Sequence, residues 1–391
     1  MLHNGVRLKS QRYEVILAKS RKDLKRYVKF PWRIYANQGN WIPPLIRSQI
    51  SKLSPDKSPF FKQGEAESFM VVKGDEVVGT VTPWMNHRSN RYKNEKAAGF
   101  GYFELIEDYE VARLLCDKVV EWAGDRGANL IRGPLHFSPQ DSPGVLVEGF
   151  DSFPPPLVTH TPPYYSVFLE RYGFQKYRDA FAYRVEFSQF NNSVDHLPAK
   201  LINVARKTQE KYHINIRNLN LDKWEDELKA AMYIFNEALG YQREGVPMDE
   251  AEFMKLASEL KQIIDPRYVL IAEVDKRPIG LYVAFPNYNL LFRKLNGRIF
   301  PFGWIHLMKR SKYITFISTK ILGVLEDYRK RGIDALFYYK IAETLMKQGE
   351  KWIDYSLVAE ENKMANRLVQ RLGGTVYKIC RTYKLEINQS K

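Results

Sequence analysis

A run of basic residues and a glycine lies where an apolar segment gives way to a predicted helix. Residues 321–325 are apolar, residues 329–331 are all basic, and Gly332 directly precedes a helix expected over 333–348. The first backbone N–H groups of a helix have no partner within it, and with nearby cations they can bind a phosphate. Glycine lets an anion approach the backbone closely. The spacing favours a phosphate cradle, and a solvated basic loop is the alternative.

The histidines, the cysteines and the segment SPQD do not show the patterns typical of metal sites, disulfides or hydrolases. The seven histidines show no spacing typical of metal ligands, so we expect no metal site. Two cysteines, Cys116 and Cys380, are too few for a disulfide scaffold or a cysteine-based metal cluster. The segment SPQD at 138–141 is not a nucleophile elbow, so nothing indicates a hydrolase.

The length of the chain and a pattern shared by its two halves indicate two similar domains. At 391 residues the chain is too long for one ordinary domain, and a hydrophobic content of 45% is enough to form a core. Each half ends with a helix, a glycine and a closing strand, with Gly173 and Gly373 in matching places. The Asn- and Ser-rich segment 187–198 is the best linker candidate, so we predict domains over 1–190 and 191–391.

Local patterns place further elements. Gly74 and Asp75 between two apolar runs predict a hairpin, and Asp108 predicts the start of a helix. Residues 134–163 are rich in proline and glycine and predict a long loop, and 286–312 predict an irregular excursion. Strands and helices alternate in both halves, which indicates two α/β domains in tandem.

The basic turn and the segments after it resemble a known superfamily. Val324, Arg329 and Gly332 fit the motif strand-V-x-x-x-x-R-x-x-G-x-[GA]-helix, which binds the acyl-coenzyme A pyrophosphate in GNAT N-acyltransferases. Residues 358–365 are similar to the motif V-x-x-x-N-x-x-A of the same superfamily. The segments FPWRIY, WIPPL, YFE, IRGP, PYYSVFLERYGF and PFGW extend the resemblance over nearly the whole chain, to a bacterial family of tandem GNAT-like proteins of similar length.

This resemblance implies a fold and a co-substrate. The implied fold class is α/β (α+β), with two tandem GNAT-like acyl-CoA N-acyltransferase domains, each a mixed, mostly antiparallel sheet flanked by helices. Acetyl-CoA or a longer acyl-CoA is the implied co-substrate, bound by the C-terminal domain without a metal. The implied CoA-binding residues are the end of a strand, the cradle with the first helical turn, and one asparagine: Leu322, Gly323, Val324, Arg329, Lys330, Arg331, Gly332, Ile333, Asp334, Ala335 and Asn362.

Several residues depart from the family pattern. Asp334 stands where members usually have glycine or alanine, and Val369 where many have the tyrosine that protonates the leaving thiolate. In the N-terminal half Glu107 and Asp108 stand in place of the cradle, and two acids repel a pyrophosphate. We therefore expect the N-terminal half not to bind CoA. A non-catalytic GNAT-fold binding or regulatory protein is an alternative for the whole chain.

The implied reaction is the transfer of an acyl group, expected to be acetyl, from a CoA thioester to a primary amine that attacks directly. A backbone N–H near Val324 would stabilise the oxyanion. Glu326 and Glu273 are the candidate general bases, with surface carboxylates or an ordered water as the alternatives. The chain also resembles the bacterial ceramide-synthase type of GNAT protein, so a long-chain N-acyltransferase acting on a lipid or sphingoid amine at the membrane surface is an alternative.

Four residues are candidates for contact with the amine acceptor, which would be a small molecule or a lipid. Asn287, Asn289 and Trp304 lie in the polar and aromatic excursion beside the presumed active domain, and Tyr165 follows the proline-rich loop. Irregular polar loops on a rigid scaffold often bind substrates. An aromatic lid over the core is the alternative.

The net charge of +15 is unevenly distributed, since residues 1–62 alone carry +11. No helix-turn-helix, zinc-finger or RNP signature accompanies this charge, so we do not expect nucleic acid binding. Peripheral contact with an anionic membrane through residues 1–62 is one explanation, and a solvated surface is the other. The sequence contains no apolar run of about 18 residues and no signal-peptide core, so we expect a cytoplasmic location, with membrane contact as the alternative. It does not predict the oligomeric state.

Overall fold

The chain forms two compact units in a computed structural model. The structure describes residues 13–137, 143–158, 160–239, 253–254, 257, 261, 264–301 and 303–387. The first unit draws on residues 1–145, 161–177 and 381–391, and the second on 146–160 and 178–380. This division is discontinuous along the chain, whereas the sequence predicts one boundary near residue 190.

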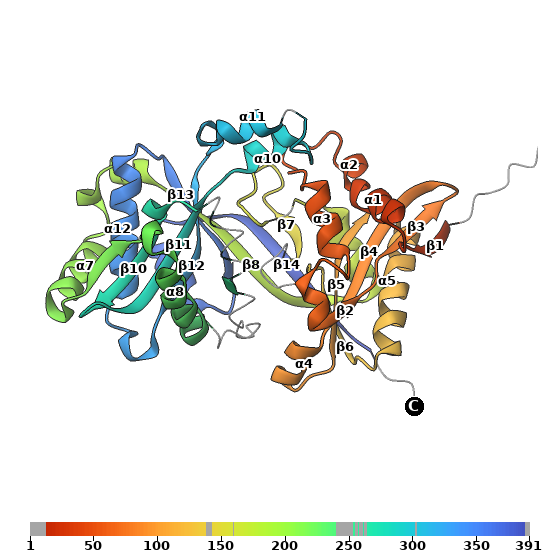
Figure 1. Cartoon of the computed structure of the whole chain (residues 1–391), viewed down its shortest axis with the longest axis horizontal. Helices are drawn as coiled ribbons and strands as arrows, with labels where there is room; N and C mark the ends of the chain where they lie inside the picture. The colour runs from red at the N-terminus through yellow and green to blue at the C-terminus, as the bar shows by residue number, and fades with distance from the viewer. Residues whose placement is uncertain are drawn as a thin grey trace, which may run out of the picture. The chain divides into compact units, whose positions relative to one another are not determined.

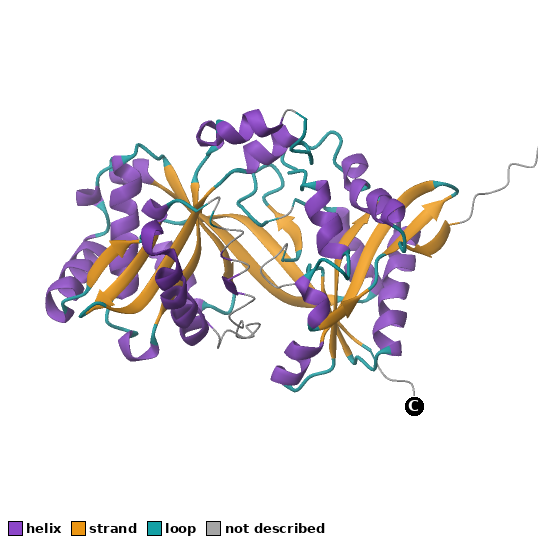
Figure 2. Cartoon of the chain, in the orientation of Figure 1, coloured by secondary structure: helices purple, strands orange, loops and turns teal. Residues whose placement is uncertain are grey.

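The first unit is a mixed, mostly antiparallel sheet flanked by helices (Figures 1 and 2). Its strands are β1 (Tyr13–Leu17), β2 (Gly64–Ala66), β3 (Phe69–Lys73), β4 (Glu76–Asn86), β5 (Ala97–Leu105), β6 (Leu130–Gly133) and the end of β14 (Thr375–Glu386). The order is β1-β3-β4-β5-β6-β14, with β2 paired to β4, and only β5 and β6 are parallel. Its helices are α1 (Arg21–Lys29), α2 (Pro31–Ile34), α3 (Ile46–Leu53), α4 (His87–Lys93), α5 (Tyr109–Asp125) and α6 (Tyr164–Tyr172).

Short-range signals explain how these elements begin and end. Gly74 has a φ of 61° in the turn between β3 and β4, as the predicted hairpin requires. The Asp108 side chain accepts a hydrogen bond from the backbone N–H of Glu110 and caps α5, which confirms the predicted helix start. Gly173, with a φ of 117°, ends α6.

The second unit has the same kind of sheet. Its strands are β7 (Val145–Glu148), β8 (Gln175–Glu186), β9 (Asn215–Asn218), β10 (Val269–Val274), β11 (Arg277–Pro286), β12 (Ile317–Val324), β13 (Trp352–Ala359) and part of β14. The order is β14-β8-β13-β12-β11-β10-β9, and β12 and β13 are parallel. Its helices are α7 (Ala199–Tyr212), α8 (Trp224–Leu239), α10 (Asn289–Leu295), α11 (Gly303–Met308), α12 (Ile333–Lys347) and α13 (Lys363–Arg371), and α7 packs against α12.

The closing strands of the two halves are exchanged. Residues 180–186 of β8 follow the last helix of the N-terminal half, yet they pair with β13 in the second unit. Residues 383–386 of β14 pair with β6 in the first unit. The exchange explains why the units do not follow a single boundary along the chain.

The excursion between β11 and β12 is partly helical, so the prediction of an irregular segment over 286–312 was wrong for α10 and α11. The start of α10 gives no signal of a helix, because Tyr288 provides no side-chain cap. Tertiary packing supplies the stabilisation instead, since Leu291 and Leu295 of α10 are buried.

Candidate active site

The start of α12 is open to an anion. Its N-cap residue is Gly332, whose φ is 85° and which offers no side chain to the first N–H groups of the helix. The first backbone bond inside the helix runs from the N–H of Leu336 to the carbonyl of Gly332. The preceding N–H groups therefore remain available to a ligand, as they are at helix starts that bind phosphate. By contrast, the start of α5 in the first unit is capped by Asp108.

Gly332 is also required by its neighbours. A Cβ atom at this position would lie 2.5 Å from Oγ1 of Thr208 and 2.6 Å from Cγ1 of Val204, both on α7. The Thr208 hydroxyl donates a hydrogen bond of 2.7 Å to the Arg331 carbonyl. Helix α7 thus fixes the backbone of the basic turn, and glycine serves this contact as well as the positive φ.

The three basic side chains of the turn have different surroundings. Arg329 donates to the carbonyl of Val324 at 3.2 Å and to that of Ala238 at 3.1 Å, so it braces the turn. The Arg331 guanidinium lies over the rings of Tyr328 and Tyr212, 4.9 and 5.3 Å from their centroids. Lys330 is exposed. Lys330 and Arg331 are thus the residues of the turn whose charge is best placed to attract a ligand.

The asparagine of the second family motif caps a helix. The side chain of Asn362 is exposed and accepts a hydrogen bond of 3.2 Å from the N–H of Ala365 at the start of α13. The neighbouring Asn366 is buried and donates to the carbonyls of Ala359 and Asn362. The connection from β13 to α13 is therefore held in one conformation.

Strands β12 and β13 separate in the middle of the sheet. Their parallel pairing covers Ile317–Thr319 with Ile353–Tyr355 and ends there, although both strands continue. A register shift against β11 leaves Lys320 of β12 as an extra residue, and a second shift in β13 falls at residues 356–357. Such β-bulges bend a strand and redirect side chains. The bulges account for the divergence of the two strands.

A polar cluster lies where the strands separate, with Asp354, Ser318 and Ser356 buried and Lys320 partly buried. Lys320 donates to Ser356 Oγ at 2.8 Å and to the Ser356 carbonyl at 3.2 Å. Ser356 Oγ donates in turn to Asp354 Oδ2 at 2.5 Å. Asp354 also accepts a hydrogen bond from Ser318 and one of 2.7 Å from the Tyr377 hydroxyl. The cluster forms a continuous hydrogen-bonded chain from an amine to a carboxylate.

Burial shifts the protonation of both ends of this chain. It lowers the pKa of Lys320 to about 8, against the opposing effect of the Asp354 charge. Burial raises the pKa of Asp354, although Lys320 and the three hydroxyl donors counteract the rise. The cluster was not predicted from the sequence. The signal was a lysine and an aspartate, each the one charged residue of its strand.

The two predicted general bases lie outside the cluster. Glu326 is exposed in the turn after β12. Glu273 on β10 is buried, and its carboxylate accepts a hydrogen bond of 2.7 Å from Arg217, which also binds Glu227 at 2.6 Å. The ion pair with Arg217 is sufficient to explain why a glutamate is buried at position 273.

Asn287 and Asn289, two of the predicted acceptor contacts, bind the protein backbone instead. Both are buried, and both donate hydrogen bonds to the carbonyl of Pro154, at 3.2 and 2.9 Å. They fasten the proline-rich segment to the second unit, so their amides are not directed at an acceptor. Trp304 lies on α11 with 47% of its surface exposed. It stands on an open surface.

Tyr165, the fourth predicted acceptor contact, is fully buried in the first unit. Its hydroxyl donates to Glu104 at 2.7 Å, and Tyr35 donates to the same carboxylate at 2.8 Å. The Tyr165 side chain points from α6 into the core, so its hydroxyl is not directed at an acceptor. Burial raises the pKa of Glu104 to about 7, although both tyrosine hydrogen bonds oppose the rise.

The raised pKa of Glu104 predicts a pH-dependent stability. The folded protein binds a proton at Glu104 between about pH 4.5 and 7, where the unfolded chain does not, so stability falls as the pH rises through this window. We expect Glu104→Gln to remove this dependence and to be more stable than wild type at pH 8, by up to about 3 kcal/mol. Urea denaturation of both proteins at pH 5 and pH 8 measures the effect. A difference between variant and wild type that is the same at both pH values would contradict it.

In the first unit the corresponding separation of strands is filled by the chain itself. The parallel pairing of β5 with β6 ends at Gly99. Beyond it the N–H of Leu135 donates to the carbonyl of Phe100 at 2.6 Å, and the Trp84 indole donates to the carbonyl of Leu135 at 3.0 Å. These contacts favour the prediction that the N-terminal half does not bind CoA.

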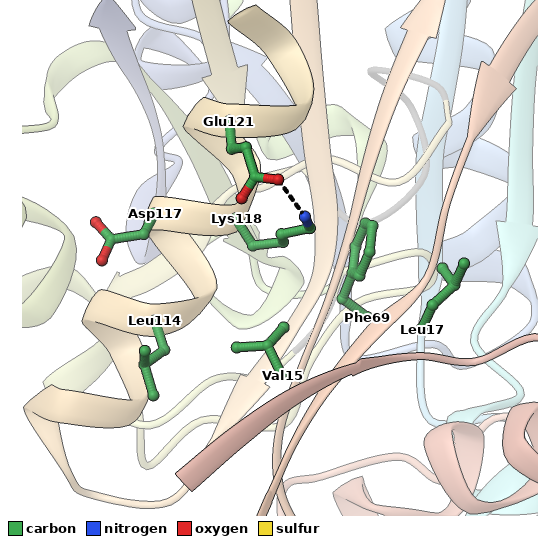
Figure 3. Close-up of a pocket in the computed structure, with 7 residues that line it drawn as sticks. All are labelled: Val15, Leu17, Phe69, Leu114, Asp117, Lys118 and Glu121. Atoms are coloured by element: carbon green, nitrogen blue, oxygen red, sulfur yellow. Dashed lines mark hydrogen bonds and ion pairs between the residues drawn. The ribbon is translucent and has the colours of Figure 1, made fainter. Parts of the chain in front are cut away.

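An open depression of about 400 Å³ on the first unit offers little chemistry (Figure 3). It lies between β1, β3 and α5, and its charged groups are paired: Lys118 with Glu121 at 2.5 Å, and Asp117 with Arg113 at 2.6 Å. Lys118 also lies 5.1 Å from the centroid of the Phe69 ring. We assign no function to it.

Among the described residues no group of three or more His, Cys, Asp or Glu side chains could hold a metal ion. Within the same ranges, no helix is both long and apolar enough to cross a membrane.

Two relatives align in sequence with nearly the whole chain. No family model matches the chain. It is 30% identical to the bacterial ceramide synthase of Caulobacter vibrioides over 377 residues, which are 95% of this chain and 96% of that protein. It is 28% identical to protein YghO of Escherichia coli, over 94% of each chain.

Two solved structures carry the same fold at low sequence identity. A tandem GNAT protein from the clavulanic acid biosynthesis pathway matches 97% of this chain and all of its own, with a TM-score of 0.58 and 12% identity. A GCN5-related N-acetyltransferase from Sphaerobacter thermophilus matches 96% of this chain and 95% of its own, with a TM-score of 0.53 and 14% identity. The predicted tandem GNAT fold is thereby confirmed.

Proposed function

The chain belongs to the family of tandem GNAT N-acyltransferases, and we propose that it transfers a long-chain acyl group from acyl-CoA to the primary amine of a long-chain base. The observation that carries the choice of substrate is the match to a ceramide synthase over nearly the full length of both chains. A ceramide is a long-chain amine that carries an N-acyl group. Of the two transfers considered from the sequence, acetyl to a small amine and long-chain acyl to a lipid amine, the match favours the second.

The donor would bind in the second unit. The open start of α12 would hold the pyrophosphate through its free N–H groups, with Lys330 and Arg331 adding charge. The pantetheine arm would lie along Leu322–Val324, where β12 has left β13. This path leads from the phosphate site toward the polar cluster at Lys320.

We assign the proton transfer to the cluster in place of Glu326 or Glu273. As the amine attacks the thioester carbonyl, a C–N bond forms and the nitrogen must lose a proton before the C–S bond breaks. The neutral form of Lys320 would accept that proton, because its pKa of about 8 leaves part of the lysine uncharged near neutral pH. Ser356 and Asp354 hold the lysine in place. The thiolate would leave as free CoA.

A product assay tests the substrate assignment. We expect purified protein to convert palmitoyl-CoA and sphinganine to an N-acylated product, detected by mass spectrometry, with release of one free thiol per product. Acetyl-CoA with a short, soluble amine is the matched comparison and should react far more slowly. Preference for the short pair would identify a small-molecule acetyltransferase, and thiol release without N-acyl product would reject transfer to an amine.

A further inference from the structure

Large apolar side chains are exposed together on the excursion between β11 and β12. Phe300, Trp304, Ile305 and Met308 are exposed to 71%, 47%, 39% and 77%. They account for four of the eleven large hydrophobic side chains that are exposed among the described residues. Three of them lie on α11 and Phe300 precedes it, and α11 packs against α10 (Figure 1). A cluster of this kind on a folded chain marks a contact surface.

All the charged residues of the same excursion are basic. The sequence contains no aspartate or glutamate between residues 287 and 325. Six cations flank the apolar side chains, three before them and three after, and all six are exposed: Arg293, Lys294, Arg298, Lys309, Arg310 and Lys312. Apolar and aromatic side chains surrounded by Lys and Arg are typical of segments that lie in a membrane interface.

The excursion is anchored to the sheet of the second unit, which contains Lys320. Leu291 and Leu295 are buried on the inner side of α10. Asn289, the first residue of this helix, donates a hydrogen bond to the carbonyl of Pro154. The N–H of Asn287 donates to the carbonyl of Phe316 at 2.8 Å, immediately before β12 begins. A contact made by this surface would therefore be held in a fixed relation to β12 and Lys320.

We propose that residues 289–301 and 303–313 form a docking surface for an anionic lipid bilayer. Lipid phosphates would neutralise the six cations, and the interface would accept the aromatic and methionine side chains. A second copy of this chain fits less well, because its six cations would face the same six. This surface differs from the basic residues 1–62, whose first twelve lie outside the described residues. The proposal rests on exposure and charge and is independent of the proposed reaction.

Vesicle sedimentation locates the contact. Phosphatidylglycerol-containing vesicles should bind the full chain in a salt-sensitive manner, and pure phosphatidylcholine vesicles much less. Phe300→Ser with Met308→Ser, and separately Lys309→Glu with Lys312→Glu, should each weaken binding about tenfold or more. Lys22→Glu with Lys25→Glu on α1 makes the same charge change at exposed positions of the first unit and should leave binding nearly unchanged.

A spectroscopic measurement reports the depth of insertion. Lipids brominated on the acyl chain should quench the fluorescence of the wild-type protein, and Trp304→Phe should lose most of that quenching. Binding abolished by the α1 pair and kept by both pairs on the excursion would overturn the proposal in favour of residues 1–62. No binding by wild type, or equal binding to neutral vesicles, would also overturn it. Since neither measurement reads activity, a negative result leaves the proposed N-acyl transfer untouched.

Discussion

Lys320→Met should lower kcat about 100- to 10,000-fold while leaving CoA binding intact. General acid–base groups contribute rate factors of this size, and methionine preserves the length and most of the volume of the side chain. Asp354 keeps its hydrogen bonds from Ser318, Ser356 and Tyr377, so the variant should fold. Thiol release under saturating acyl-CoA and amine measures kcat, and calorimetric titration measures CoA affinity.

The pH profile separates proton transfer from a structural role. If neutral Lys320 accepts the proton, the wild-type rate should rise with pH through a midpoint near 8. The Lys320→Met variant should not show this rise in rate. Lys347→Met, at a side chain that is 73% exposed on the same unit, is the matched control and should behave as wild type. A wild-type rate that falls through pH 8, or a Lys320→Met variant with more than half of the activity, would reject the assignment.

Lys330→Glu with Arg331→Glu should weaken CoA binding about 100-fold. Two attractive charges at the open start of α12 become repulsive, and contacts between cations and phosphate are among the stronger polar interactions. The wild-type affinity should also fall with ionic strength more steeply than that of the variant. Calorimetric titration of CoA at two salt concentrations measures both effects.

The α1 pair, Lys22→Glu with Lys25→Glu, is again the control, because it changes the net charge equally in the other unit. It should bind CoA as wild type does. Unchanged CoA affinity in the Lys330 and Arg331 double variant would mean that the phosphates bind elsewhere. The double variant is a better probe than a substitution of Gly332, since a side chain there would also collide with Thr208 and Val204.

The local parts of this site could be predicted from the sequence. A strand, a basic turn, a glycine and a helix follow one another within about 25 residues, and α12 begins at Ile333 as expected. Asp108 likewise identified the start of α5 because a cap acts within three residues. Both features depend on short-range backbone geometry, which a single sequence encodes directly.

The non-local parts could not be predicted. Lys320 and Asp354 meet only because β12 and β13 pair in parallel and then separate at two bulges. Asn289 appeared to be an acceptor contact because no local pattern shows that Pro154, on a segment 135 residues earlier, accepts its hydrogen bond. The exchange of β8 and β14 is hidden for a similar reason, since equivalent closing strands carry equivalent local patterns.

Amide hydrogen exchange with and without CoA tests most directly whether the donor binds at the separated strands of the second unit. We predict that CoA protects peptides covering residues 322–336, the strand end and the start of α12, and leaves residues 97–112, the matching region of the first unit, unchanged. The Lys330 and Arg331 double variant should lose that protection at the same CoA concentration. Protection of residues 97–112, or no protection of 322–336 at saturating CoA, would contradict the account.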